Sequence, residues 1–236
     1  MNRFIQKIKR DSPLTTVGIL SAGVGSRIKS HEPRSLLKIG NKCLLQHQLD
    51  TINSIFSEPE IIAGIGIHSN KILKRFGGKL RLVENQLYDS TGSFETLRLI
   101  VNNTTGNSLL FFHGDLYFDI NTLSGADYSK SFVVVDDEQR IREKEVGVTV
   151  VNDKASILSY GLSVKWCQIA FLTGKEFGIL RQICSKGTPE SKTLLTFEVI
   201  NSIINRGGAF MAHKPKQMSI VEIDCMKDIK HENFNI

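Results

Sequence analysis

The sequence predicts an α/β protein: a mostly parallel sheet with helices on both faces, followed by a second lobe of mixed β structure. In the first half, short apolar segments alternate with segments whose apolar residues have helical spacing. Alternating strands and helices are typical of a parallel sheet, because the chain crosses back over the sheet through a helix. After Asp119, short β-rich segments separated by turns replace this pattern.

The elements of the first half follow from the spacing of their apolar residues. A short apolar run at residues 17–20 ends in glycines, and apolar residues recur at helical spacing from Leu44 onward. Pro33, which lies between them, interrupts any early helix, so this stretch is expected to be extended. Further strands are expected at residues 61–67, 80–84 and 109–112, and further helices near residues 70–76 and 93–101.

The second half is expected to begin with β structure and to return to helices. We expect strands at residues 131–136, 147–152, 157–162 and 167–172, and helices near residues 177–184 and 197–205. No repeat, low-complexity tract or proline-rich linker marks a boundary. We therefore expect a basic extension over residues 1–14 and one domain over residues 15–236, with halves at 15–120 and 121–236 that share one sheet.

Composition and charge limit the classes of function. The chain has 236 residues, of which 41% are hydrophobic and 23% charged, as in an ordinary globular protein. Its formal charge of +6 suits anionic partners, but the basic residues are scattered and are densest at Lys7, Lys9 and Arg10. Phosphorylated small molecules explain this charge as well as nucleic acid does, and a nucleic-acid binder is the least favoured class.

The cysteines and the apolar segments indicate the compartment. The four cysteines form no Cys-x-x-Cys pair, so neither a zinc site nor a disulfide framework is predicted. No segment approaches the roughly 18 apolar residues of a membrane span, and no apolar region follows the basic start as in a signal peptide. We expect a cytoplasmic protein with no membrane partner.

A glycine-rich turn follows the first predicted strand, in the order Ser-Ala-Gly-Val-Gly-Ser-Arg at residues 21–27. Glycines let backbone N–H groups approach phosphate oxygens, and Arg27 adds a fork of donors. The turn is neither a P-loop, which needs Gly-Lys-Ser/Thr, nor a dinucleotide fingerprint, because Ile28 takes the place of the third glycine. Such turns also serve packing alone, so the pattern by itself leaves a nucleotide role open.

Asp115 follows a strongly apolar predicted strand through a Gly-Asp turn. A carboxylate delivered in this way commonly holds a divalent metal. Alternatively, Asp115 has only a structural role, as a turn residue that caps a neighbouring element. Together with an upstream phosphate loop, the metal reading implies a nucleoside triphosphate and chemistry on it.

Four sequence blocks resemble the nucleotidyltransferases that join a nucleoside triphosphate to a phosphorylated sugar or alcohol. Residues 20–49 contain a glycine loop with arginine, then Pro-Arg-Ser-Leu, then a helix, as in that family. Residues 85–97 are similar to its base-binding segment, most closely in bacterial phosphocholine cytidylyltransferases. Residues 113–117 resemble its metal-binding Gly-Asp, and residues 221–228 its closing Glu-Ile-Asp-x-x-x-Asp. The resemblance implies a Rossmann-like sheet with an antiparallel second lobe.

The resemblance also implies a reaction and a set of site residues. The acceptor phosphate attacks the α-phosphorus of the triphosphate, Mg²⁺ is held by Asp115 and Asp224, and Arg27 and Arg34 steady the departing pyrophosphate. Cytidine is the favoured base, and uridine comes next. The implied nucleotide-binding residues are Ser21, Ala22, Gly23, Val24, Gly25, Ser26, Asn85, Gly92, Ser93 and Asp115.

Two departures from the family pattern bear on activity. Arg34 stands where the family has lysine, with Lys38 nearby as a substitute, and an arginine fork is not equivalent to a compact ammonium. Tyr160 stands where many relatives carry a lysine for the acceptor phosphate. The alternative is therefore a catalytically weak protein that binds a nucleotide or nucleotide sugar. The acceptor-binding candidates are Tyr160, Lys165, Glu198 and Glu222, while Lys144 is a further candidate and His113 and Trp166 are expected to pack.

Overall fold

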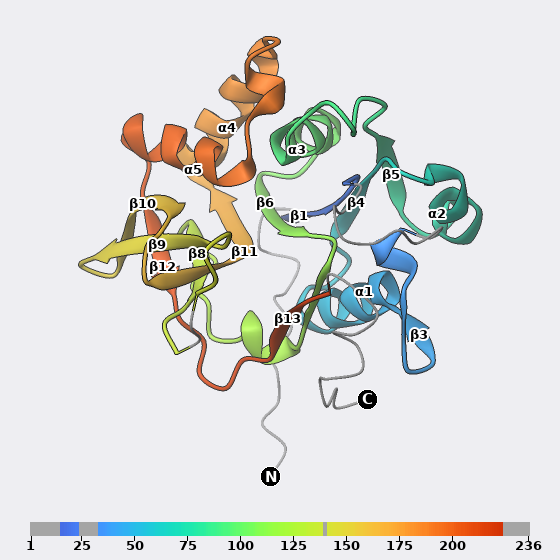
Figure 1. Cartoon of the computed structure of the whole chain (residues 1–236), viewed down its shortest axis with the longest axis horizontal. Helices are drawn as coiled ribbons and strands as arrows, with labels where there is room; N and C mark the ends of the chain where they lie inside the picture. The colour runs from blue at the N-terminus through green and yellow to red at the C-terminus, as the bar shows by residue number, and fades with distance from the viewer. Residues whose placement is uncertain (1–14, 24–32, 139–140, 224–236) are drawn as a thin grey trace.

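The structure is a computed structural model that describes residues 15–23, 33–138 and 141–223. It confirms the predicted α/β fold, with one large mixed sheet and helices on both of its faces (Figure 1). The large sheet contains β1 (Thr15–Ser21), β4 (Glu60–Ile65), β5 (Arg81–Glu84), β6 (Ser108–His113), β8 (Phe132–Asp136), β9 (Val146–Val151), β10 (Lys154–Tyr160), β11 (Val164–Thr173) and β12 (Phe210–His213).

The remaining elements are helices, single turns and two short ribbons. The ribbons pair β2 (Lys38–Ile39) with β3 (Lys42–Cys43), and β7 (Leu116–Phe118) with β13 (Ile220–Glu222). The α-helices are α1 (Leu44–Ile55), α2 (Ser69–Phe76), α3 (Ser93–Asn103), α4 (Gly174–Lys186) and α5 (Thr196–Asn205). The 3₁₀ turns are η1 (Arg34–Leu36), η2 (Ile120–Thr122) and η3 (Ser191–Thr193).

The large sheet joins the two halves of the chain without a break. Its nine strands run in the order β5-β4-β1-β6-β11-β8-β12-β10-β9. The first four are parallel, whereas β11 is antiparallel to both β6 and β8. In the second half, β10 runs antiparallel to β12 and β9, and β12 alone pairs in parallel, with β8. The parallel region and the antiparallel lobe are thus one continuous hydrogen-bonded layer.

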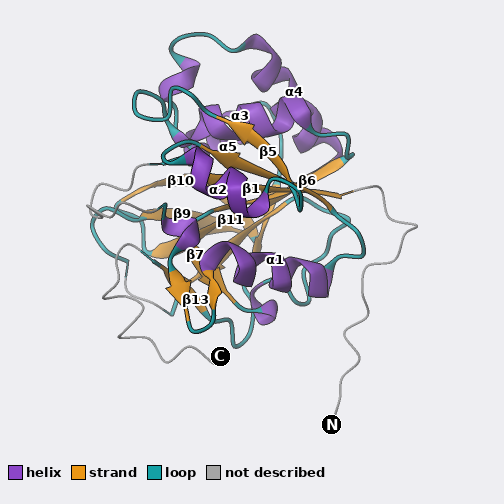
Figure 2. Ribbon diagram, turned by 90° about the vertical axis from the view of Figure 1, so that its right-hand side faces the viewer, coloured by secondary structure: helices purple, strands orange, loops and turns teal. Residues whose placement is uncertain are grey.

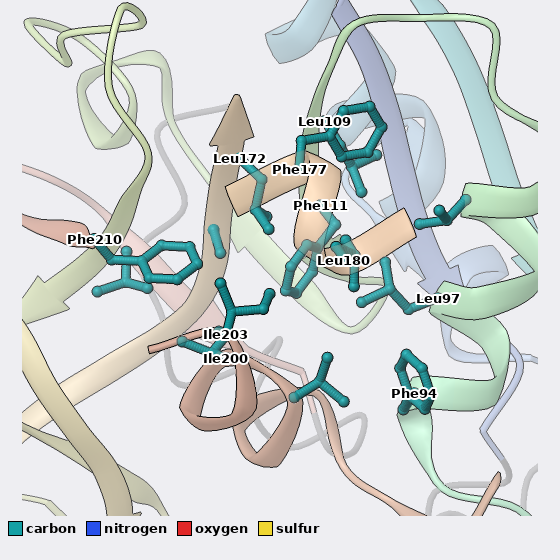
Figure 3. Packing of buried hydrophobic residues seen from close by; sticks show 14 of the residues in the cluster. Phe94, Leu97, Leu109, Phe111, Leu172, Phe177, Leu180, Ile200, Ile203 and Phe210 are labelled. Atoms are coloured by element: carbon teal, nitrogen blue, oxygen red, sulfur yellow. The ribbon is translucent and has the colours of Figure 1, made fainter. Parts of the chain in front are cut away.

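A hydrophobic core covers each face of this sheet. Figure 2 shows helices on both sides of the strands. Helices α3, α4 and α5 cover one face, where Phe94, Phe111, Phe177 and Ile200 pack together (Figure 3). Helices α1 and α2 cover the other face. Central strands buried on both faces need nearly continuous apolar sequence, and β6 is such a strand, with five consecutive buried residues. The two cores fix the strand ends from which the site is built.

Most predicted elements lie where the sequence placed them. The differences are the end of one strand and several short strands that were not predicted. Strand β10 ends at Tyr160 rather than Leu162, because Gly161 has a φ of +77° and turns the chain. The two ribbons and β12 were not predicted. Each has two to four residues, and β7, β13 and β12 pair with distant segments, so local periodicity carries no signal for them.

The topology predicts a site at the carboxyl ends of the central strands. Strand β1 lies between β4 and β6, so the chain moves outward from β1 to β5 and then returns to the other side of β1. In open α/β sheets, ligands bind beyond the carboxyl ends of the strands at such a reversal. The carboxyl ends here are Ser21 of β1 and His113 of β6. The glycine-rich turn and Asp115 continue directly from these two ends.

The histidine of β12 makes the stability of the fold depend on pH. Burial lowers the pKa of His213, and its Nε2 has no hydrogen-bond partner among the described residues. Below pH ~6.5 the unfolded chain takes up a proton that the folded site resists. As the pH decreases, the free energy of unfolding therefore decreases by at most about 1.4 kcal/mol per pH unit for this group. We expect His213→Leu to flatten that slope in urea unfolding between pH 7.5 and 5.5. An unchanged slope would contradict this assignment.

Candidate active site

A cavity of about 140 Å³ opens at the reversal point of the sheet. Its walls come from the carboxyl ends of β1 and β6, from the turn at η1, and from the loop that leads into α3. These segments are far apart in sequence but meet because their strands and helices share the two cores. The lining residues are Leu20, Ser21, Ala22, Gly23, Arg34, Ser35, Asn85, Tyr88, Thr91, Gly92, Ser93, Thr96, His113, Gly114 and Asp115.

Three buried side-chain oxygens of this lining have no hydrogen-bond partner within the described part of the chain. They are Ser21 Oγ, Ser35 Oγ and Asp115 Oδ1. Buried polar atoms are nearly always hydrogen-bonded, so three that line one cavity call for an explanation. Two hydroxyls and a carboxylate oxygen are suited to a polar ligand, such as a phosphate chain with its cation.

Arg34 and Asp115 form an ion pair across the cavity. Arg34 Nη1 lies 2.5 Å from Asp115 Oδ2, and the two side chains are only 15% and 16% exposed. A charge pair with so little exposure is weakly screened by solvent, so its partners are held firmly in place. The structure therefore brings together the two predicted catalytic residues that lie in its described part.

The backbone of Arg34 is fixed by its neighbours. The η1 turn closes through Leu36 N donating to Pro33 O at 2.9 Å, and Leu36 itself is buried against the α1 face of the sheet. Leu37, also buried, accepts a bond from Leu44 N at the start of α1. Within the described part of the predicted extended segment, residues 34–36 thus form a single turn held by these two apolar anchors. Lys38 is exposed on β2 and does not line the cavity.

The carboxylate of Asp115 suits a hard divalent cation. Magnesium takes oxygen ligands, and its protein sites often supply only one or two carboxylates. Asp115 Oδ1 is buried and unpartnered among the residues described, so it can accept such an ion. The described chain holds no cluster of three or more His, Cys, Asp or Glu side chains that would form an all-protein metal site. The residues present therefore fit a magnesium shared with phosphate oxygens.

The C-terminal ribbon reaches the same place. Ile223 N donates to Asp115 O at 2.8 Å, and β13 pairs with β7 immediately beyond Asp115. The second predicted metal ligand, Asp224, follows Ile223 directly in sequence but lies outside the described residues. Of the glycine-rich turn, Val24, Gly25, Ser26 and Arg27 also lie outside them.

The loop before α3 forms the far wall of the cavity, and Asn85 organises it. Asn85 is 3% exposed, and its Nδ2 donates to Thr91 Oγ1 at 3.0 Å and to Thr96 Oγ1 at 3.2 Å. Its Oδ1 accepts from Leu87 N at 3.1 Å. Because these bonds use both amide hydrogens and the carbonyl oxygen, Asn85 shapes the loop that faces a ligand.

His113 and Ser93 connect this cavity to a second one. His113 Nε2 lies 3.0 Å from Thr196 Oγ1, and Ser93 Oγ accepts from Thr196 N at 3.0 Å. Burial, together with the charge of Arg34, holds the pKa of His113 below its usual range despite the opposing charge of Asp115. The imidazole is therefore neutral near pH 7, and the predicted packing role of His113 is accompanied by a place in both cavity walls.

The second cavity, of about 200 Å³, lies in the β lobe and shares Ser93 and His113 with the first. Lys165 Nζ is 2.8 Å from Glu145 Oε1, and Arg142 N donates to Glu145 Oε2 at 2.7 Å. Although burial opposes them, these two bonds lower the pKa of Glu145, the bond from Arg142 more than the bond from Lys165. Tyr160 packs edge-on against Phe197 at 5.5 Å between ring centroids. The lining of this second cavity also includes Arg142, Lys144, Val146, Trp166, Gln168, Leu195, Thr196 and Glu222.

A bulge in β11 aims one side chain at the C-terminal ribbon. Pairing with β8 shifts register between Trp166 and Ala170, and Gln168 has a φ of +59°. Non-glycine residues rarely adopt this conformation, and bulges commonly re-aim a side chain near a site. Gln168 Nε2 donates to Glu222 Oε2 at 3.0 Å. The bulge thus ties the β lobe to the strand that ends beside Asp115.

The structure distributes the predicted acceptor residues unevenly. Tyr160, Lys165 and Glu222 line the second cavity. Glu198 lines neither cavity, and its Oε2 accepts from Leu195 N at 2.7 Å at the start of α5. That bond is a helix-capping contact.

Sequence reasoning missed several lining residues. Ser35, Thr91, Arg142, Glu145 and Thr196 were not singled out. Ser35 and Thr91 lie inside blocks that carry the family resemblance, so the blocks contained a signal for them. The others depend on which distant segments meet, and local sequence does not show this.

The sequence also matches known proteins. The family described as the MobA-like NTP transferase domain matches residues 17–125. A segment of 50 residues, 21% of this chain, is 36% identical to the bifunctional protein GlmU of Gluconobacter oxydans. The match spans only 11% of that protein's length.

Solved structures share the fold over nearly the whole chain. The inositol-1-phosphate CTP transferase from T. maritima superimposes with a TM-score of 0.72 at 14% identity, covering 91% of each chain. The CTP:phosphocholine cytidylyltransferase from Streptococcus pneumoniae gives 0.72 at 16% identity, covering 92% of this chain and 96% of that one. The resemblance to the nucleotidyltransferases is therefore confirmed, by the domain match over residues 17–125 and by the fold of the described chain.

Proposed function

We propose that the protein transfers a nucleoside monophosphate from a nucleoside triphosphate to a phosphorylated sugar or small phospho-alcohol and releases pyrophosphate. The observation that carries this proposal is the convergence of Ser21 Oγ, Ser35 Oγ and Asp115 Oδ1 on one cavity at the reversal of the sheet. CTP is the favoured donor and UTP comes next, on the resemblance of residues 85–97 to cytidylyltransferases.

The reaction needs no protein nucleophile. An oxygen of the ionised acceptor phosphate forms a bond to the α-phosphorus, and the bond from that phosphorus to the β-bridging oxygen breaks. The electron pair of the broken bond leaves on pyrophosphate. The protein contributes position and charge: Arg34 binds the departing phosphates, and Ser21 and Ser35 donate to phosphate oxygens. The family resemblance gives Arg27 the same role as Arg34. Asp115 and Asp224 would hold Mg²⁺, which would supply charge neutralisation on the phosphates.

The second cavity is the proposed acceptor site. It shares Ser93 and His113 with the first cavity, so an acceptor there borders the donor. The basic groups Lys165, Lys144 and Arg142 suit an acceptor phosphate, while Glu222 and Tyr160 suit its hydroxyl or cationic end.

A triphosphate screen tests the reaction. The protein is incubated with Mg²⁺, each of CTP, UTP, ATP and GTP, and a panel of phosphorylated sugars and alcohols, and pyrophosphate is followed. We expect release with a pyrimidine triphosphate that depends on one class of acceptor. Nucleotide binding by calorimetry without pyrophosphate release under any combination would favour the alternative, a nucleotide or nucleotide-sugar binding protein. The observation that favours this alternative is Arg34, which stands where the family has lysine.

Tyr160 provides a test of the acceptor site. We expect Tyr160→Ala to raise the KM for the acceptor by about tenfold, because it removes an aromatic wall of the second cavity, and to leave the KM for the triphosphate within about twofold. The control is Ile157→Ala, a residue of the same strand with the same exposure, 48% against 49%, that lines neither cavity. Equal effects of the two variants would contradict the placement of the acceptor.

A further inference from the structure

The ion pair of Arg34 and Asp115 bears on how a metal reaches the site, an inference that rests on the proposed function. Arg34 Nη1 lies 2.5 Å from Asp115 Oδ2, with both side chains at least 84% shielded from solvent. The guanidinium of arginine is positively charged, so a cation already accompanies this carboxylate. A divalent ion approaching Asp115 therefore meets a positive charge already in place.

The guanidinium and a metal compete for the same carboxylate. Two cations drawn to one carboxylate lie close to each other and repel, and little solvent lies between them to screen that repulsion. Asp115 Oδ1 is left without a partner in the described chain, so the carboxylate has room for one more ligand on that side. What disfavours the metal is thus the charge of Arg34 rather than the lack of an oxygen.

A phosphate chain gives Arg34 another partner. Ser21 and Ser35 line the same cavity, and their buried hydroxyls have no hydrogen-bond partner in the described chain, so both can donate to such a chain. The η1 backbone is anchored by buried Leu36 and Leu37, so only the side chain of Arg34 needs to turn. An arginine fork matches phosphate oxygens in a way that a single ammonium does not.

We propose that Arg34 is a tethered cation that occupies Asp115 in the nucleotide-free protein and exchanges the carboxylate for the triphosphate when the nucleotide binds. The metal then enters with the nucleotide, and the free protein holds divalent ions weakly. Arg34 sets the order of binding, in addition to any contact it makes with the departing phosphates.

The test measures two ligands separately, without turnover. Mn²⁺ binding to the nucleotide-free protein is followed by the loss of its free-ion EPR signal, and CTP binding is measured by calorimetry in EDTA. For Arg34→Met we expect Mn²⁺ to bind at least about tenfold more tightly and CTP at least about tenfold more weakly. A merely structural role for Arg34 would weaken both ligands, so changes of opposite sign identify the exchange.

Matched variants separate this effect from general charge and from folding. Arg81→Met removes the same charge from another arginine–carboxylate pair, 3.0 Å from Glu60 at the opposite end of the sheet, and is expected to change neither affinity. Arg34→Gln removes the charge but keeps a donor for Asp115, so it repeats the result if Arg34→Met folds poorly. In Arg34→Gln, adding Asp115→Asn should abolish the gain in Mn²⁺ affinity.

Other outcomes would overturn the exchange. Mn²⁺ affinity that is unchanged or weaker in both Arg34 variants would mean that Arg34 supports the metal site instead of competing with it. A gain that survives Asp115→Asn would place the metal elsewhere. Because these measurements use no acceptor and no turnover, they stand apart from the proposed transfer, which fails only if the triphosphate screen gives no pyrophosphate.

Discussion

Replacing Asp115 with asparagine is expected to reduce metal-dependent pyrophosphate release by at least about a thousandfold. The amide keeps the volume of the carboxylate and an oxygen that accepts from Arg34, but it loses the negative charge that a divalent cation needs. Loss of that ion removes several kcal/mol of charge stabilisation as pyrophosphate leaves, and about 4 kcal/mol corresponds to the expected factor. Initial rates with CTP and Mg²⁺ measure the effect.

The matching control is Asp50→Asn. Asp50 also forms an ion pair, 2.6 Å from Lys42, but its side chain is 42% exposed on the outer face of α1. Exposed pairs contribute little, so we expect turnover within about twofold of the parent protein. Circular dichroism and melting temperature show that both variants fold. Full turnover in Asp115→Asn, with a normal metal requirement, would remove Asp115 from the reaction.

The sequence was sufficient for most of the fold because local pattern and global arrangement agree. Strand β6 has five consecutive buried residues, which is typical of a central strand covered on both faces. Helix α1 repeats apolar residues at helical spacing, which is typical of a helix that packs one face against a sheet. The short ribbon between β7 and β13 joins segments about a hundred residues apart. No local period specifies such a pairing, and for that reason it was not predicted.

The candidate site could be predicted only where chemistry is concentrated in short blocks. The glycine-rich turn, Arg34 and Asp115 stand out because each follows an apolar strand or a proline. The contact between Arg34 and Asp115, 81 positions apart, depends on the position of η1 against α1, which the sequence does not show. Asn85 shows a related limit. The sequence motif predicts Asn85 as a nucleotide-binding residue, but the motif does not show the hydrogen bonds through which Asn85 shapes the loop before α3.

The approach of the α3 loop to the α5 loop gives the second large prediction. A Cβ on Gly92 would lie 2.1 Å from Leu194 O and 2.4 Å from Thr193 O, and Gly92 N donates to Lys192 O at 2.8 Å. These neighbours are backbone atoms that cannot turn aside as a side chain can. We expect Gly92→Ala to cost about 3 kcal/mol, which lowers the melting temperature by about 6–12 °C in a protein of this size.

Gly92→Ala should also impair binding at both cavities, because the same contact holds Ser93 against Thr196. Ser93 lines both cavities, and Thr196 contacts it as well as His113. The control is Gly78→Ala, at a glycine where an added Cβ meets nothing within 4 Å. Calorimetry with CTP and thermal unfolding of the two variants measure the difference. A stable Gly92→Ala protein with normal CTP affinity would mean that the two loops can separate without disturbing the site, and the donor and acceptor cavities would then not depend on this contact.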